Sequence, residues 1–154
     1  MTKWPKGKGP KSVTEKLYAS IQEASPLILE ARTLVMDPSS KTLGYAIIEA
    51  GDIVASGTVD LGKEAVHYRM QKLGEYLQNA GCYDVLLVER IRGQMAHAYL
   101  SWSVGAILAN TTADIFLEMP ISVWKAHAGK EHVKSDENDA IAMANALIAL
   151  AKGE

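Results

Sequence analysis

Cysteine is almost missing from this chain, since Cys82 is the only one among 154 residues. A single cysteine excludes an internal disulfide and fits a reducing compartment, so we expect a cytoplasmic protein. Cys82 lies just before a predicted strand, where we expect it to pack. Long apolar runs are also missing, because none approaches the roughly 20 residues that a membrane-spanning helix needs. Behind the lysines of the first residues there is no hydrophobic segment, so we do not expect this stretch to be a secretory signal.

Neither sign of charge dominates: the net charge is −2, and 48% hydrophobic residues indicate one soluble globular domain. The charges are unevenly distributed, however. Residues 1–14 hold four lysines and no acid, so the remaining 140 residues carry −6. Acids pooled at one metal site would account for most of this deficit, and bound cations would cancel it. The basic segment either contacts phosphates or is a flexible, solubilising leader; its lysines are Lys3, Lys6, Lys8 and Lys11.

Hydrophobic periodicity predicts an α/β chain with the order β-β-β-α-β-α-β-α. Residues 1–30 form a basic extension, with a disordered start and a short helix over about 13–24 that ends at Ser25-Pro26; residues 31–154 form the main domain. The expected strands are 32–37, 44–49, 53–61, 85–89 and 114–119, and the expected helices are 64–79, 94–111 and 136–151. A turn at Gly51-Asp52 joins the second and third strands. A polar stretch with Lys125, Lys130 and Lys134 follows Pro120. A hairpin meander followed by alternating units predicts a mixed five-stranded sheet with helices on both faces.

Four acidic residues stand at the ends of these predicted elements. Asp37 and Glu89 each end a hydrophobic strand, and Asp136 and Asp139 open the last helix, where Ser135 is a good N-cap. An acid at the end of a buried strand is costly unless something compensates its charge. The two strands are expected to be parallel neighbours whose carboxyl ends meet at one edge of the sheet. We therefore expect a site where carboxylate oxygens hold divalent cations, as in a metal-dependent nuclease.

The predicted helix over 94–111 is apolar nearly all round its circumference. A helix without a polar face is buried on two sides, against its own sheet and against something else. We expect that second contact to be another subunit, which makes the protein a homodimer. The side chains proposed for this interface are Tyr99, Trp102 and Ile107.

Several motifs resemble those of the RuvC-like Holliday junction resolvases. The segment from Asp37-Pro38 to Gly44-Tyr45 is similar to their first motif, and Val88-Glu89 is similar to their second. Residues 136–142 resemble their closing Asp-x-x-Asp-Ala helix. Glu118 and Lys125, seven positions apart, also match the pattern. The resemblance covers about residues 32–151.

The resemblance implies an RNase H-like fold, a homodimer, and cleavage of four-way junctions and other branched DNA with two Mg²⁺ or Mn²⁺ ions. Carried over residue by residue, it makes metal ligands and catalytic residues of Asp37, Glu89, Asp136 and Asp139. The ions would activate a water and stabilise the leaving oxygen, which leaves a 5′-phosphate and a 3′-hydroxyl. Lys125 would stabilise charge at the scissile phosphate, or else be a solvated loop lysine. Further DNA contacts are expected from Arg90, Arg92, Lys130 and Lys134 in addition to the N-terminal lysines.

Some positions depart from the family pattern. Ser39 replaces the glycine that follows Asp-Pro, and Leu43 replaces the threonine before Gly-Tyr, with Thr42 one position early. Arg92 stands where many members have an aromatic wedge, and an arginine there indicates phosphate or base-stacking contacts. The short segment from Lys125 to Asp136 and the N-terminal extension are more typical of a phage-type resolvase, which would act in the cytoplasm of a bacterial host.

Two other functions fit the same residues. One is a non-catalytic RNase H-like module that binds nucleic acid through its basic arm, although four unneutralised acids would repel one another there. The other is an RNase H-type ribonuclease, which shares the metal chemistry but not the apolar dimer helix. The histidines have no zinc-site spacing. We expect them at the surface, with His97 near enough to the Glu89 loop to touch DNA.

Overall fold

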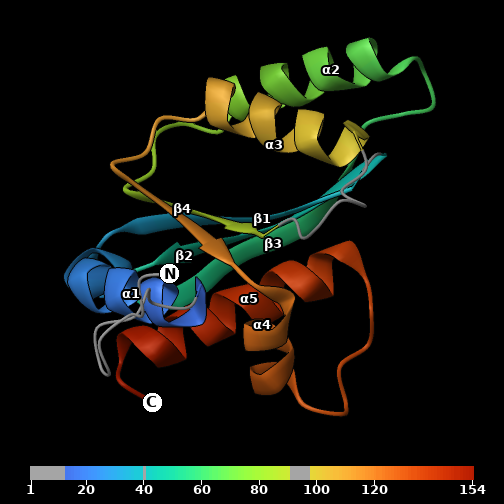
Figure 1. Cartoon of the computed structure of the whole chain (residues 1–154). Helices are drawn as coiled ribbons and strands as arrows, with labels where there is room; N and C mark the ends of the chain where they lie inside the picture. The colour runs from blue at the N-terminus through green and yellow to red at the C-terminus, as the bar shows by residue number, and fades with distance from the viewer. Residues whose placement is uncertain (1–12, 40, 91–97) are drawn as a thin grey trace, which may run out of the picture.

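The computed structural model describes residues 13–39, 41–90 and 98–154. Within them, one mixed sheet of five strands has the order β3-β2-β1-β4-β5 (Figure 1). The strands are β1 (Arg32–Pro38), β2 (Thr42–Glu49), β3 (Asp52–Asp60), β4 (Val85–Glu89) and β5 (Ile115–Met119). The predicted class, a mixed five-stranded sheet with helices on both faces, is therefore confirmed.

The first three strands form an antiparallel meander. The β2–β3 hairpin turns through Ala50 and Gly51, which both have positive φ angles, of 51° and 80°. Two such residues make a type I′ turn, whose twist matches that of the flanking strands. The turn was predicted one position later, at Gly51-Asp52, but Asp52 already pairs with Glu49.

The last two strands extend the sheet in parallel, as expected. β4 pairs with β1 so that Met36 lies beside Val88, and β5 pairs with β4. Alternate side chains of a strand point to opposite faces of its sheet. In β1, Val35 belongs to one hydrophobic core cluster, whereas Leu34 and Met36 belong to the other. Asp37 therefore projects from the same face as Val35.

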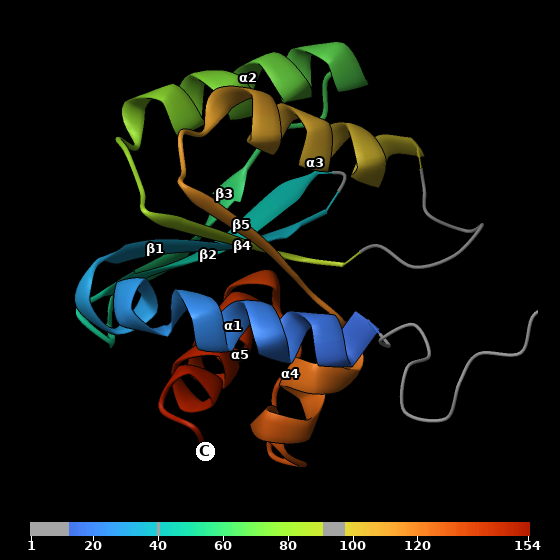
Figure 2. The same ribbon diagram turned by 60° about the vertical axis from the view of Figure 1, so that its left-hand side comes forward.

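Helices cover both faces of the sheet (Figures 1 and 2). The pair α2 (Val66–Asn79) and α3 (Ala98–Asn110) lies on one face. The other face carries α1 (Val13–Glu30), α4 (Ile121–Ala128) and α5 (Asp136–Ala151). The cluster on this second face is rich in alanine, because α5 buries Ala140, Ala144 and Ala146 against the strands. Small side chains let the helix lie close to the sheet, and its predicted bounds of 136–151 are confirmed.

The first helix is longer than predicted, because it continues through Pro26 to Glu30. A proline inside a helix removes one hydrogen bond and costs about 3 kcal/mol. Burial compensates for this cost, since Ile28 is fully buried at a spacing that continues Leu17, Ile21 and Ala24. These side chains share the core of the α5 face. The division of the chain at residue 30 stays a prediction.

Two further expectations were wrong. The polar stretch after Pro120 begins with the helix α4, whose Val123 and Trp124 are buried. Cys82 is exposed and so has no packing role. In the described residues, no helix is long and apolar enough to cross a membrane. The predicted disorder of the N-terminal residues and the start of the 94–111 helix lie outside the described residues.

Candidate active site

The site begins where β1 and β4 end side by side. Asp37 and Glu89 follow the paired residues Met36 and Val88, so the parallel register brings the two carboxyl groups together. Asp37 is only 6% exposed. By the alternation of the strands, both acids project from the face that α5 covers. The predicted meeting of two strand-end acids is therefore present in the fold.

The electrostatic environment of Asp37 is unfavourable for a negative charge. Burial is the largest cause, followed by the charge of Glu89 and a hydrogen bond with it, and then by the charges of Asp139 and Asp136. Together they raise the pKa of Asp37 from its ordinary 3.8 to about 9. All three other predicted acids therefore act on the Asp37 carboxyl group, which is the common point of the cluster.

The last helix delivers the other two acids. The Ser135 hydroxyl accepts a hydrogen bond of 3.0 Å from the backbone N–H of Asn138, which makes it the N-cap that the sequence predicted. Asp136 and Asp139 lie in the first turn, where the helix dipole favours negative charge. Asp139 is buried, with 8% exposure.

Gly44 fixes how closely this helix start approaches the sheet. It pairs with Asp37 across the β1–β2 ladder. A Cβ atom at position 44 would overlap the backbone carbonyl of Asp136, so no side chain fits there. Beside it, the Thr42 hydroxyl donates a hydrogen bond to the Asp136 carboxylate. Ser39, in place of the family's glycine, holds the turn through its hydroxyl, which accepts from the Thr42 N–H at 3.0 Å.

Two aromatic residues that the sequence did not single out contact the acids. The Trp124 indole Nε1 donates to Glu89 Oε1 at 3.2 Å. The His132 ring Nε2 lies 2.7 Å from Asp139 Oδ1. Their rings meet edge to face, with centroids 5.4 Å apart. The surface position expected for His132 was wrong, because its side chain is only 18% exposed and is bonded to Asp139. His67 and His127 are exposed, as expected.

Two of the predicted lysines lie next to the acids. A pocket of about 320 Å³ is lined by Lys125 and Lys134 together with Asp139, Trp124 and His132. Lys125 Nζ lies 5.9 Å from the centre of the Trp124 ring. A phosphate in this pocket would meet two positive charges beside the carboxylates. Lys130 is exposed in the loop after α4.

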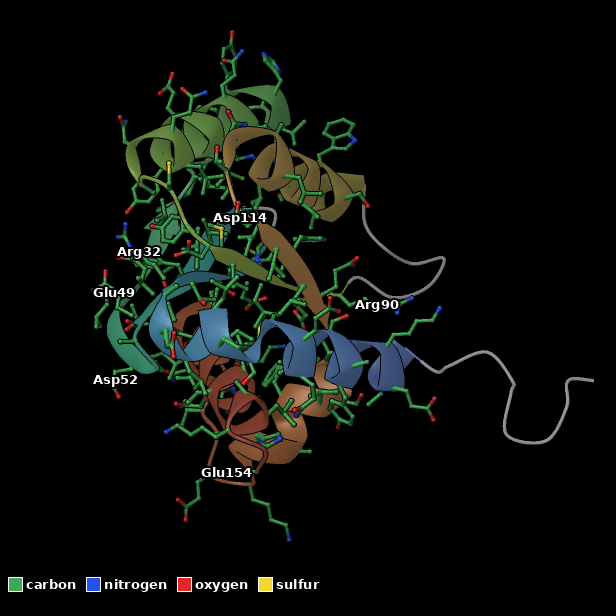
Figure 3. The ribbon with its side chains drawn as sticks, turned by 90° about the vertical axis from the view of Figure 1, so that its left-hand side faces the viewer. Arg32, Glu49, Asp52, Arg90, Asp114 and Glu154 are labelled. Carbon is green, nitrogen blue, oxygen red and sulfur yellow. The ribbon has the colours of Figure 1, made fainter. Side chains whose placement is uncertain are left out.

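Arg90 marks a second hollow near the same edge. Its side chain lines a cavity of about 240 Å³ with Lys16 and Glu118. Figure 3 shows Arg90 on the side where α1 begins, and Arg32 and Glu49 on the opposite side. Arg92, His97 and the four N-terminal lysines lie outside the described residues, as does the side chain of Tyr99.

The four acids fit a hard divalent cation, because such cations prefer carboxylate oxygens as ligands. A bound cation would also offset the negative charges that act on the buried Asp37. The ligand geometry is not formed in the structure. Among the described residues, no three His, Cys, Asp or Glu side chains are arranged around one ion position. Glu89, Asp136 and Asp139 each direct a carboxylate oxygen to a protein donor.

The apolar helix α3 has one covered face and one exposed face. Ile107 is fully buried in the core between α3 and the sheet, so its proposed contact with a second subunit is wrong. The helix turns Ile107 towards its own sheet, a direction that apolar composition all round the helix does not reveal. Trp102 and Leu108 are 51% and 47% exposed, and Gly105 between them is also exposed.

Comparison with solved structures identifies the fold. The yeast mitochondrial Holliday junction resolvase Ydc2 superposes with a TM-score of 0.60 over 92% of this chain and 94% of its own, at 12% identity. Thermus thermophilus RuvC in complex with a Holliday junction substrate matches with a TM-score of 0.57, covering 79% of this chain and 94% of that one at 14% identity. A second structure of Thermus thermophilus RuvC gives 0.52 at 17% identity, over 79% and 95% of the two chains. The chain has the RuvC fold.

Sequence comparison alone adds nothing to this result. No protein-family model matches the chain, and no curated protein matches it either. Identities of 12–17% show a shared fold and leave the activity open. The RuvC-like resemblance inferred from the motifs is confirmed at the level of the fold.

Proposed function

We propose that the protein is a metal-dependent, structure-selective endonuclease that resolves Holliday junctions and cleaves other branched DNA. The observation that carries this proposal is the convergence of Glu89, Asp136 and Asp139 on the buried Asp37. Like charges placed around a buried acid cost stability. Divalent cations would remove that cost, so a cluster of this kind indicates a cation site rather than a structural feature.

The four carboxylates would hold two Mg²⁺ or Mn²⁺ ions. When bound, such ions activate a water molecule and neutralise the leaving oxygen of a phosphodiester. Residues of the chain would supply the other requirements of the reaction, which are the placement of the ions and the neutralisation of the phosphate. Asp37 lies at the centre of the cluster, and Lys125 and Lys134 line the pocket next to Asp139, where they would neutralise the phosphate backbone.

The substrate class in this proposal rests on the fold and on the charges near the site. The solved structures of this fold include a RuvC bound to a Holliday junction. Basic residues line two separate pockets, Lys125 and Lys134 in the one that contains Asp139, and Arg90 and Lys16 in another beside the end of β4. Branched DNA offers backbones in several directions, and positive charge placed in this way would contact more than one arm.

A dimer completes the proposal. Two nicks are needed to resolve a four-way junction, and a pair of sites related by two-fold symmetry supplies them. We propose that the exposed face of α3, formed by Trp102, Gly105 and Leu108, is the self-complementary surface.

The test compares cleavage of a four-way junction, a flap, a linear duplex and an RNA–DNA hybrid in the presence of Mg²⁺. We expect the wild-type protein to cut the branched DNAs and Asp37→Asn to bind the junction without cutting it. The neutral amide weakens cation binding but also removes repulsion against DNA. Asp52→Asn is the matched control, because Asp52 is an exposed acid at the start of β3.

The outcomes separate the candidate functions. If the wild type cuts only the RNA–DNA hybrid, the protein is a ribonuclease. If the wild type binds the junction but cuts none of the four substrates, the protein is a binding module. Near-normal turnover by Asp37→Asn would overturn the assignment of the metal site.

A further inference from the structure

Trp124 and His132 form a bridge between two carboxylates that come from different elements. Glu89 ends β4, Asp139 lies on α5, and Trp124 belongs to α4. The indole N–H contacts Glu89 at 3.2 Å, and the imidazole contacts Asp139 at 2.7 Å. The two rings touch edge to face, at 5.4 Å and an interplanar angle of 64°. The result is a continuous chain of contacts from Glu89 to Asp139.

The bridge is placed rigidly. Trp124 is 2% exposed and is among the largest fully buried side chains, so its ring has little freedom to reorient. His132 is held on one side by that ring and on the other by the Asp139 carboxylate. An ionised carboxylate only accepts hydrogen bonds, so the His132 N–H donates to it. Each bond fixes one oxygen of its carboxylate.

These contacts leave the carboxylates able to bind a cation. A carboxylate has two oxygens and about four lone-pair sites. A single donor from the protein therefore orients the group and leaves acceptor sites for a ligand bond. Carboxylates that bind metals are commonly oriented in this way, and loss of the orienting partner typically weakens metal affinity by about 10–100-fold.

We propose that Trp124 and His132 are positioning residues, which orient Glu89 and Asp139 for divalent-cation binding from outside the acid cluster. This inference rests on the proposed function, because it takes the four acids to be a cation site. It assigns to α4 and to the loop before α5 a role that the sequence motifs do not indicate. The pair acts as a unit, because the edge-to-face contact transmits a displacement of either ring to the other.

The experiment measures Mn²⁺ affinity by calorimetry in the full chain, alongside the melting temperature. His132→Phe keeps a ring against Trp124 but has no N–H donor, and Trp124→Phe keeps an aromatic core residue but loses the indole donor. Each should weaken Mn²⁺ binding by about 10–100-fold. His132→Gln retains an N–H donor and should restore much of the affinity that His132→Phe loses. His127→Phe, an exposed histidine of α4, is the matched control and should bind as the wild type does.

The outcomes distinguish this inference from the proposed function. If the wild type binds Mn²⁺ and both phenylalanine variants bind it equally well, the positioning role is wrong and the cation site stands. If His132→Gln loses as much affinity as His132→Phe, ring packing matters and the donated hydrogen bond does not, which also overturns the proposal. If the wild type itself binds no Mn²⁺, the proposed function fails in its metal requirement and the positioning role fails with it. Should Trp124→Phe unfold, the comparison of the two His132 variants still decides the question.

Discussion

At the scale of single residues, Asp37 controls how the protein responds to pH without cations. The folded protein holds the proton of this carboxyl group with a pKa of about 9, against 3.8 ordinarily. The unfolded chain releases this proton at much lower pH than the folded protein does. The contribution of the Asp37 proton to the free energy of unfolding is therefore full below about pH 3.8, decreases as the pH rises and is lost above about pH 9.

We therefore predict that, in a chelator, the melting temperature of the wild type falls between pH 5 and pH 9. Asp37→Asn cannot ionise and should show a shallower decrease, with a higher melting temperature than the wild type at pH 8. Thermal denaturation followed by circular dichroism measures both, and Asp52→Asn should follow the wild-type curve. Identical pH curves for Asp37→Asn and the wild type would mean that the pKa of Asp37 is not raised in the folded protein.

Gly44 is the residue whose replacement should separate activity from stability most clearly. A methyl group there overlaps the carbonyl of Asp136 and pushes the start of α5 from the sheet. Overpacking of this kind costs about 1–3 kcal/mol, and a displacement of about 1 Å at a catalytic group can cost about 100-fold in rate. We predict that Gly44→Ala remains folded but loses about 100-fold in junction cleavage.

The control for this variant is Gly153→Ala, because a Cβ at position 153 has no atom within 4 Å, whereas the φ of 82° makes an alanine there strained. Gly153 follows the end of α5 that is opposite to Asp136 and Asp139, so this variant should lose about 1–2 kcal/mol of stability and keep its junction cleavage. A Gly44→Ala protein with full activity would show that the close approach of α5 is not needed.

The sequence predicted that the four acids, Lys125 and Lys134 lie at one site, but it gave no sign of the side chains that form hydrogen bonds with the acids. Acids at strand and helix ends can be recognised because each interrupts a hydrophobic pattern. His132 gives no such signal, since its partner Asp139 lies seven positions away across a loop and a helix start. The Thr42–Asp136 contact joins residues 94 positions apart, which only the folded chain brings together.

At the scale of elements, α3 should determine the oligomeric state. Trp102 is half exposed on a helix whose other face is buried in the core. We predict that Trp102→Glu gives a folded monomer that binds cations but nicks junctions without coupling the two cuts. Sedimentation at micromolar concentration, with and without junction DNA, measures the state.

Tyr68→Glu is the control for this change, because Tyr68 is similarly exposed on α2, at 57%. Tyr68→Glu should leave the oligomeric state of the protein unchanged. A wild-type protein that sediments as a monomer under both conditions would contradict the dimer.

Prediction was accurate for elements that have one strong periodic pattern and weaker for those decided by tertiary contacts. The five strands and the helix α5 follow directly from alternation, apolar runs and the Ser135 cap. The sequence predicted that α1 ends at Ser25-Pro26, because a proline usually breaks a helix. The helix continues to Glu30 because Ile28 is buried in the core, a contact that forms only in the folded chain. The two-turn helix α4 was missed because its buried residues, Val123 and Trp124, are adjacent and give no helical spacing.

At the scale of the whole molecule, the basic N-terminal segment should strengthen DNA binding without affecting the chemistry. Four lysines precede α1, which begins at Val13. Each phosphate contact adds about 0.9 to the slope of log affinity against log salt. We predict that deletion of residues 1–12 reduces the slope for junction binding by up to about 3–4 and leaves the cleavage rate at saturating enzyme unchanged.

A full-length variant with the four lysines replaced by glutamine should behave like the deletion, which separates charge from chain length. An unchanged salt dependence in both proteins would make the segment a leader.

The order in which the acids enter the fold follows from the position of α5. This helix packs against α1, α4 and three strands, and it brings Asp136 and Asp139 to the site. A chain grows on the ribosome from its N-terminus at about 5–20 residues per second. Asp37 and Glu89 are therefore made well before the helix that completes their cluster and covers their face of the sheet. We expect that a chain truncated before Asp136 lacks two acids of the cluster and the cover of this face of the sheet, so that it neither binds Mn²⁺ nor cuts DNA.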